Sequence, residues 1–208
     1  GSNQGSDTTF PVLIGFGADY VVKHSSWTSH ACAISGTGSV FCWGSAHNGR
    51  LGIGATTGDF GPTLLDLGMG RTATEISVGG SHSCALLDND YVSCWGLNAD
   101  GRTGQGSNAA NVLSEPENIT VIPYGLNVTN ISAGNAHTCA ILDDDSLMCW
   151  GANYYGQLGD GTTTNSNTPV AVNLPTGRTA TAISAGYAHT CAILDDSSVM
   201  CWGYNNYR

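Results

Sequence analysis

Cysteine is the residue type whose spacing in this sequence points most directly to chemistry. Eight cysteines fall into four pairs whose members are ten positions apart: Cys32 and Cys42, Cys84 and Cys94, Cys139 and Cys149, Cys191 and Cys201. Thiols in this pattern form disulfides, bind zinc, or stay buried as small apolar groups. Zinc is disfavoured because the Cys-x-x-Cys spacing is absent and no local quartet of ligands occurs. The even count and the single spacing favour four disulfides over eight free thiols, which indicates an oxidising compartment.

The residues around each pair predict how the two cysteines meet. Cys139 and Cys149 lie in two apolar runs that are separated by the polar residues Asp143–Asp145. Such a pattern predicts a β-hairpin, and a turn at this point places the two cysteines directly opposite each other. Facing residues of neighbouring antiparallel strands have Cα atoms roughly 4.5–5.5 Å apart, which a disulfide can span.

Histidine and tryptophan recur in register with the cysteines. A histidine lies two residues before each first cysteine, and a tryptophan follows each second one: His30, His82, His137 and His189; Trp43, Trp95, Trp150 and Trp202. A catalytic histidine is expected once, beside unique partners. We therefore interpret the histidines as structural hydrogen-bonding groups and the tryptophans as packing between repeated units. The alternative for the tryptophans is an exposed ring that stacks on sugars or senses light.

No other motif predicts catalysis or a bound group. The sequence lacks a Gly-x-Ser-x-Gly elbow, a phosphate-binding loop, a His-Glu-x-x-His motif and a dinucleotide fingerprint. Acidic turns at residues 88–90, 143–145 and 195–196 lack the ligand spacing of a calcium loop, so solvated hairpin tips are the favoured interpretation. We expect no enzyme activity, no catalytic residues, no metal site and no cofactor.

Internal repetition predicts the elements that hold these residues. The first cysteines of successive units are 52, 55 and 52 residues apart, a period typical of a four-stranded β-propeller blade. Both strands of each hairpin are almost entirely apolar, which predicts a sheet covered on both faces. A loop rich in glycine and asparagine follows, and then a short strand, as in Pro169–Leu174. No helical periodicity is present.

The repeat also predicts the domain organisation. Four units cover about residues 22–73, 74–128, 129–180 and, incompletely, 181–208. Residues 1–21 resemble the end of a unit and are expected to complete a preceding blade. We therefore expect a section of a longer array.

Charge excludes some classes of partner. The chain has 16 acidic and 6 basic residues and a formal net charge of -10. Nucleic acid and anionic membranes bind chiefly to lysine and arginine, so neither is expected as a partner. The apolar runs are too short for membrane insertion. Three Asn-x-Ser/Thr triplets are candidates for N-glycosylation: Asn118, Asn127 and Asn130.

The combined motif resembles a known repeat. The pattern Ala-Gly-x-x-His-Thr-Cys, best preserved at Ala133–Cys139 and Ala185–Cys191, leads into Cys-Trp-Gly and then Gly156-Gln-Leu-Gly-Asp-Gly161. It resembles the regulator of chromosome condensation (RCC1-like) repeat, in the cysteine-paired version of secreted and cell-surface proteins. The resemblance implies an all-β propeller of four-stranded blades, about four of them here, incomplete or part of a larger array. The first unit departs at Trp27, where the others have glycine, and Arg50 and Arg102 replace the glutamine.

The resemblance and the cysteines together give the functional hypothesis. We expect a non-catalytic, extracellular or cell-surface structural protein whose blades stack into a larger assembly or filament. Its partners would be other copies of itself or another protein. The alternative is a secreted recognition module that binds a protein or glycan through loops on one rim of the propeller. Residues outside the repeat pattern or in its loops are the contact candidates: His24, Trp27, Tyr154, Tyr155, Tyr204 and Tyr207.

Overall fold

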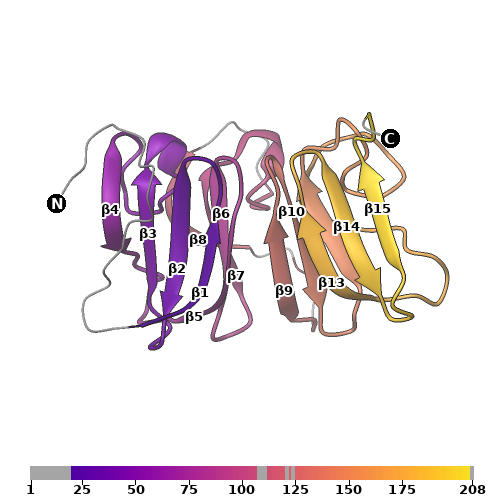
Figure 1. Ribbon diagram of the computed structural model, residues 1–208, viewed down its shortest axis with the longest axis horizontal. Helices are drawn as coiled ribbons and strands as arrows, with labels where there is room; N and C mark the ends of the chain where they lie inside the picture. Colours follow the sequence, from indigo (N-terminus) through magenta and orange to yellow (C-terminus); the bar gives the residue numbers. More distant parts are fainter. Residues whose placement is uncertain (1–19, 107–111, 120–121, 123–124, 207–208) are drawn as a thin grey trace, which may run out of the picture.

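The computed structural model describes residues 20–106, 112–119, 122 and 125–206, and its strands form four antiparallel sheets (Figure 1). We call these sheets blades 1 to 4. Blade 1 consists of β1 (Val21–Ser26), β2 (His30–Ser35), β3 (Val40–Ser45) and β4 (Asp59–Leu64). Blade 2 consists of β5 (Ala73–Val78), β6 (His82–Leu87), β7 (Val92–Leu97) and β8 (Val112–Asn118). Blade 3 consists of β9 (Val128–Ala133), β10 (His137–Leu142), β11 (Leu147–Gly151) and β12 (Ser166–Ala171). Blade 4 has three strands in the described residues: β13 (Ala180–Ala185), β14 (His189–Leu194) and β15 (Val199–Gly203).

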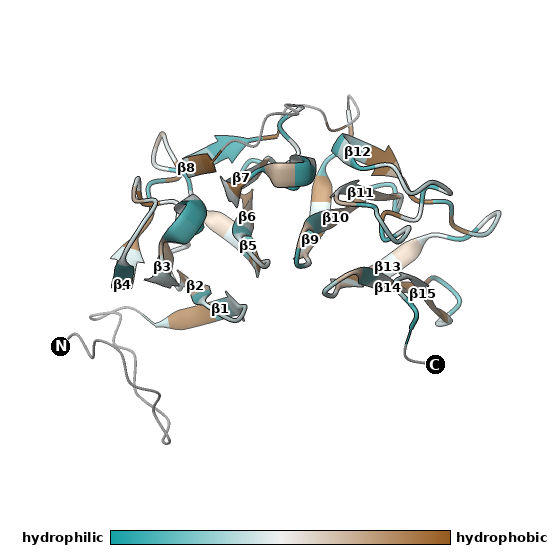
Figure 2. Ribbon diagram, turned by 90° about the horizontal axis from the view of Figure 1, so that it is seen from above, coloured by the Kyte–Doolittle hydropathy of each residue, from teal (hydrophilic) through white to brown (hydrophobic). Residues whose placement is uncertain are grey.

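The blades fan out along an arc (Figure 2). The first strand of each blade lies on the inside of the arc, and β5 contacts both β1 and β9, while β9 also contacts β13. Blades 1 and 4 lie at opposite ends of the arc and leave it open. This is the radial arrangement of a propeller that is not closed, as the sequence predicts.

The hairpin register agrees with the prediction in every blade. Cys139 pairs with Cys149 and Ile141 with Leu147 across β10 and β11. The equivalent cysteines face each other in the other three blades, and all four pairs are disulfides with Cα atoms 4.0–4.1 Å apart. Every residue of β6 and β10 is buried, which confirms that these sheets are covered on both faces.

The hydrophobic core lies between successive blades. Each of its three clusters combines the disulfide of one blade with the tryptophan of the next. Cys32 and Cys42 pack with Trp95, Cys84 and Cys94 with Trp150, and Cys139 and Cys149 with Trp202. Each disulfide therefore links the two strands of one hairpin. Between successive blades, the apolar side chains of these clusters pack against each other.

Two details differ from the sequence prediction. The outer strand of blade 3 covers Ser166–Ala171, three residues earlier than the predicted Pro169–Leu174. Proline at position 169 is accommodated because β12 is an edge strand, where an N–H can be missing. Two three-residue 3-10 helices, η1 (His47–Gly49) and η2 (Ala99–Gly101), form within the glycine-rich loops. The expected role of residues 1–21 falls almost wholly outside the described residues.

Candidate functional site: the interfaces between blades

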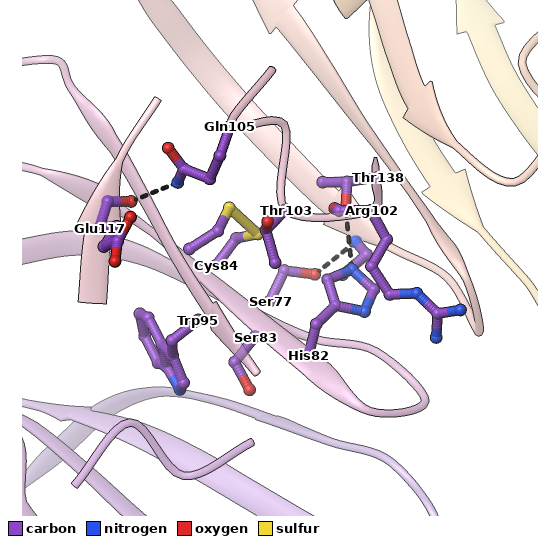
Figure 3. Close-up of a disulfide and its surroundings, with 12 residues drawn as sticks. Ser77, His82, Ser83, Cys84, Trp95, Arg102, Thr103, Gln105, Glu117 and Thr138 are labelled. Carbon is purple, nitrogen blue, oxygen red and sulfur yellow. Dashed lines mark hydrogen bonds between the residues drawn. A yellow bond between two sulfur atoms is a disulfide. The ribbon is translucent and has the colours of Figure 1, made fainter. Parts of the chain in front are cut away.

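The recurring histidine forms a hydrogen bond across each interface. Its Nε2 atom reaches a hydroxyl on the following blade, and that hydroxyl belongs to the residue directly after the next histidine. The three pairs are His30 with Ser83 at 2.9 Å, His82 with Thr138 at 2.8 Å (Figure 3), and His137 with Thr190 at 2.9 Å. The structure therefore gives the repeated histidines the structural role that their recurrence predicts.

Each hydroxyl also fixes the histidine tautomer. Ser83, Thr138 and Thr190 donate to the backbone carbonyls of Arg50, Arg102 and Gln157, at 3.1, 2.9 and 2.9 Å. A hydroxyl has one proton to donate, so toward the histidine it must accept. The proton of each imidazole is therefore on Nε2, and the buried Nδ1 atoms of His30, His82 and His137 have no hydrogen-bond partner.

Burial keeps these imidazoles neutral. Loss of hydration, together with the nearby Arg50 guanidinium, lowers the pKa of His30 from 6.5 to about 3. Loss of hydration and the charges of His189 and Arg102 lower the pKa of His137 to about 4. The pKa of the fully buried His82 is also well below its usual value, chiefly because of desolvation. The bond between each buried histidine and its hydroxyl is thus one between neutral groups at physiological pH.

At two of the three interfaces the tryptophan of the next blade uses the same carbonyl, whereas the buried indole N–H of Trp150 has no hydrogen-bond partner. Trp95 donates its indole N–H to Arg50 and Trp202 to Gln157, both at 3.0 Å. Ser83 is the cross-strand partner of Trp95, as Thr190 is of Trp202. At these two interfaces one hydroxyl and one indole from neighbouring strands therefore donate to a single carbonyl of the preceding blade, while the rings of Trp95, Trp150 and Trp202 pack in all three interfaces.

Glycine three residues before the histidine is needed for close approach. A Cβ atom on Gly134 would lie 2.4 Å from the Gly186 carbonyl of blade 4 and 2.5 Å from Cε1 of His137. Gly79 is equally crowded by Gly134 and His82. In blade 1 this position is Trp27, which is partly buried against the first core cluster. The first interface is therefore built around an indole instead of the close backbone approach.

Comparison with known proteins agrees with this repeated geometry. A family model described as the regulator of chromosome condensation (RCC1) repeat matches residues 37–86, 90–141 and 144–193, well over half of the chain. A second model of the same description matches residues 73–102, 128–157 and 180–208. The chain belongs to the RCC1 repeat family.

Three proteins that are similar to this chain are much longer than it is. It is 30% identical over 195 residues to the human E3 ubiquitin-protein ligase HERC2, covering 91% of the chain and 4% of that protein. It resembles a chain in the crystal structure of Kap60 bound to yeast RCC1 (Prp20), with a TM-score of 0.79, 20% identity, and coverage of 92% and 45%. It also resembles the ectodomain of the Physcomitrella patens receptor kinase CR4, with a TM-score of 0.58, 25% identity, and coverage of 100% and 47%. The chain thus spans less than half of each of these relatives.

Within the described residues, blades 1 and 4 each have one face that no neighbouring blade covers. On blade 4 a hollow of about 830 Å³ is lined by the disulfide Cys191–Cys201, with His189, Tyr187 and Trp202 beside it. On blade 1 a smaller hollow of about 290 Å³ is lined by His24, Ala31, Ala33 and Trp43, among others. Both hollows lie on faces that are covered by a neighbouring blade elsewhere in the arc.

The predicted contact residues do not form one site but lie at four separate places. His24 is exposed on the open face of blade 1, whereas Trp27 directly follows β1 and packs against the core cluster between blades 1 and 2. Tyr154 donates a 2.6 Å hydrogen bond to Asp100 of blade 2 across a loop rim. The rings of Tyr155 and Tyr204 pack edge to face beside the hollow on blade 4, with their centroids 4.8 Å apart. Tyr207 lies outside the described residues.

Two groups of interface residues were missed from the sequence. The hydroxyl after the histidine recurs as Ser83, Thr138 and Thr190, and its repetition was the available signal. Tyr187 is 69% exposed and lines the hollow on blade 4, in the position held by Asn135 in blade 3. Its signal was an aromatic residue where the other units have small or polar ones.

The remaining candidates are surface features. Asn118 and Asn127 are exposed, whereas Asn130 lies within β9 and is partly buried. Two acidic turns are held by short-range bonds, since Asp144 accepts from the Ser146 N–H and Asp196 from the Ser198 N–H, both at 3.0 Å. Among the described residues, no group of three or more potential metal ligands gathers in one place. No helix in that same part of the chain is long and apolar enough to cross a membrane.

Proposed function

We propose that this chain is a non-catalytic structural module whose blades stack, through their end faces, into a larger protein assembly outside the reducing cytosol. The observation that carries the proposal is the open face of blade 4. It presents the same histidine, disulfide and apolar residues that are buried between blades in the rest of the chain. Exposed surface of this kind and extent is characteristic of protein interaction sites.

The disulfides support a location at the cell surface or outside the cell. All eight cysteines are paired within hairpins, and such bonds persist where glutathione and thioredoxin do not reduce them. The ectodomain of the receptor kinase CR4, a relative in structure, is itself a part of a receptor outside the cell. Both observations support an extracellular role for this chain.

A photo-crosslinking residue placed on the open face tests the proposal. Ile193 is 44% exposed on blade 4, so it is replaced by a photoreactive amino acid in the protein produced in its own source. We expect crosslinks to a polypeptide with RCC1-type blades. The matched control carries the same residue at Tyr154, which is 61% exposed on the loop rim. Crosslinks from the rim alone would contradict the stacking proposal.

A second candidate function is recognition of a protein or glycan through the rim loops. It is favoured by one cluster in which Tyr154, Asn165 and Arg102 all bond to the carboxylate of Asp100, at 2.6, 2.9 and 3.1 Å. This cluster joins blades 2 and 3 and holds an exposed tyrosine in a fixed position. Tyrosine in rigid loops is a common contact residue at recognition surfaces.

A further inference from the structure

We propose that the open face of blade 4 binds one further blade of a specific chemistry: a blade with serine or threonine directly after its histidine and isoleucine on its inner strand. We further propose that blade 1 of a second copy of this chain is not that blade. The inference deepens the proposed function and depends on it, because it defines which blade can stack on this face.

The three internal interfaces show what a following blade must supply. Its hydroxyl accepts from the histidine of the preceding blade, as Thr190 accepts from His137. An N–H of its inner strand donates to a serine of the preceding blade, as Ala185 donates to Ser132 at 2.9 Å. Its inner-strand isoleucine packs on the preceding disulfide, as Ile131 packs on Cys84 and Cys94. These contacts occur in the same form at more than one interface.

Blade 4 keeps the complete set of groups that receive such a blade. His189 holds the position of His137 and is exposed, and Ser184 holds the position of Ser132 and is exposed as well. Ile193 and Val199 pair across β14 and β15 as Ile141 and Leu147 pair in blade 3. They are 44% and 65% exposed, whereas Ile141 and Leu147 are 3% and 2% exposed between blades 3 and 4. The face is therefore built as an interface and is continuous with the established ones.

Blade 1 lacks the two side chains that a following blade contributes. Ala31 stands where the other blades have Ser83, Thr138 and Thr190, so it offers no side-chain oxygen to an incoming histidine. His24 stands where they have isoleucine. In a head-to-tail pair of copies, its imidazole would be pressed against the disulfide and the apolar pair of blade 4.

Both changes oppose self-association through this face. The imidazole N–H of His189 would be buried against Ala31 with no oxygen to accept from it, and a buried donor without a partner is costly. The imidazole of His24 would lose its hydration where an aliphatic side chain is required. Trp43 and Ala33 retain the repeated identity on that side, but neither supplies the missing hydroxyl. The open face of blade 4 therefore selects a blade other than blade 1 of a second copy.

A double substitution in blade 1 tests this selection. The variant His24→Ile/Ala31→Thr gives blade 1 both missing groups, and both sites lie on an open face, so the fold is little affected. Sedimentation velocity over a range of concentrations is compared for the purified wild-type chain and the variant. We expect the wild-type chain to remain monomeric and the variant to associate at least about tenfold more tightly, which corresponds to one restored buried hydrogen bond.

Two controls identify the face that is used. Adding His189→Ala to the double variant removes the donor and should return the chain to a monomer. Association should also protect Cys191–Cys201 from a mild reductant, because that disulfide lies in the covered face. Circular dichroism and a count of four disulfides establish that each variant is folded.

Three outcomes would overturn the inference. Wild-type chains that associate in a His189-dependent manner would make a second copy the occupant. A folded double variant that stays monomeric would mean that the hydroxyl and the isoleucine do not define the partner. Association that survives His189→Ala would place the contact elsewhere. None of these results depends on crosslinking in the native source, so the inference and the proposed function can fail separately.

Discussion

His82 and Thr138 are 56 residues apart in the sequence, and 2.8 Å separates the imidazole Nε2 of one from the hydroxyl of the other in a fully buried interface. Thr138 donates its own proton to the Arg102 carbonyl at 2.9 Å, so donor, relay and acceptor alternate between blades 2 and 3. The same three-membered chain recurs at the neighbouring interfaces. These polar contacts link the same two blades that are also joined by the packing of a disulfide against a tryptophan.

Removal of the Thr138 hydroxyl should destabilise the interface. In Thr138→Val the shape is kept, but the His82 N–H and the Arg102 carbonyl each lose a bond while they remain buried. We expect a loss of about 2 kcal/mol in the free energy of unfolding, measured by urea denaturation. Thr181→Val is the matched control, because Thr181 is exposed and its hydroxyl donates to the Ile193 carbonyl at 3.2 Å on the surface. Equal losses of unfolding free energy in the two variants would contradict a stabilising role for the His82–Thr138–Arg102 hydrogen bonds.

Stability should fall as the pH decreases below the usual histidine pKa of about 6.5. In the unfolded chain a histidine binds a proton near that value, whereas folding holds the pKa of His137 at about 4. The unfolded state therefore binds more protons between these values, and each buried histidine costs about 1.4 kcal/mol per pH unit across the window. This contribution to the free energy of unfolding is lost completely once the pH falls to the pKa that the histidine has in the folded chain. Chemical denaturation at a series of pH values from neutral down to that of the folded-state pKa measures the slope.

A substitution identifies the histidines as the source of this pH dependence. In His137→Gln the side-chain amide can still donate to Thr190, but it does not titrate. We expect a shallower dependence on pH than in the wild-type chain, whatever the change in stability at neutral pH. An unchanged slope would show that other groups carry the acid sensitivity.

A methyl group on Gly134 should be poorly tolerated. The added Cβ of Gly134→Ala would lie 2.4 Å from the Gly186 carbonyl, which is backbone and cannot rotate away. Blades 3 and 4 would have to separate, at a cost of roughly 2–3 kcal/mol. In Gly61→Ala the new Cβ meets nothing within 4 Å, so its stability should stay near the wild-type value. Thermal unfolding of both variants measures the difference, and similar midpoints would contradict the close packing.

The four disulfides should differ in resistance to reduction. Cys32, Cys84 and Cys139 and their partners have 0% exposure, whereas Cys191 is partly exposed and Cys201 is exposed on the open face. With a graded reductant followed by alkylation and peptide mass spectrometry, Cys191 and Cys201 should be modified first. The intact oxidised chain should be lighter than its all-thiol form by eight hydrogens, two for each of four bonds. Simultaneous modification of all four pairs would contradict the burial pattern.

The sequence predicted the parts of the structure that depend on side-chain spacing. The ten-residue separation within each cysteine pair and the polar turn between them determine the hairpin register, and Cys139 does face Cys149. Apolar strands predicted sheets covered on both faces, and β6 and β10 are covered. Recurrence of histidine and tryptophan predicted structural roles, and the interfaces assign them.

The parts that were missed depend on backbone atoms and on neighbouring blades. Arg50 and Arg102 differ from the glutamine of the third unit, yet their carbonyls make the same recurring contact, because every residue type supplies a carbonyl. The roles of the Ser83 and Thr138 hydroxyls cannot be seen from the sequence, because each accepts from a histidine of the preceding blade. The significance of Ala31 and His24 likewise becomes visible only once the face to which they belong is known.

Every covalent cross-link of this chain closes within one hairpin, and the joints between blades in the described residues are non-covalent: packing, hydrogen bonds and the Lys23–Glu75 ion pair. Duplication or deletion of a whole unit therefore leaves every cysteine with its disulfide partner. The disulfide of one unit can also form without a cysteine from another unit. An array built on this plan can change its length by recombination between units while each unit matures independently.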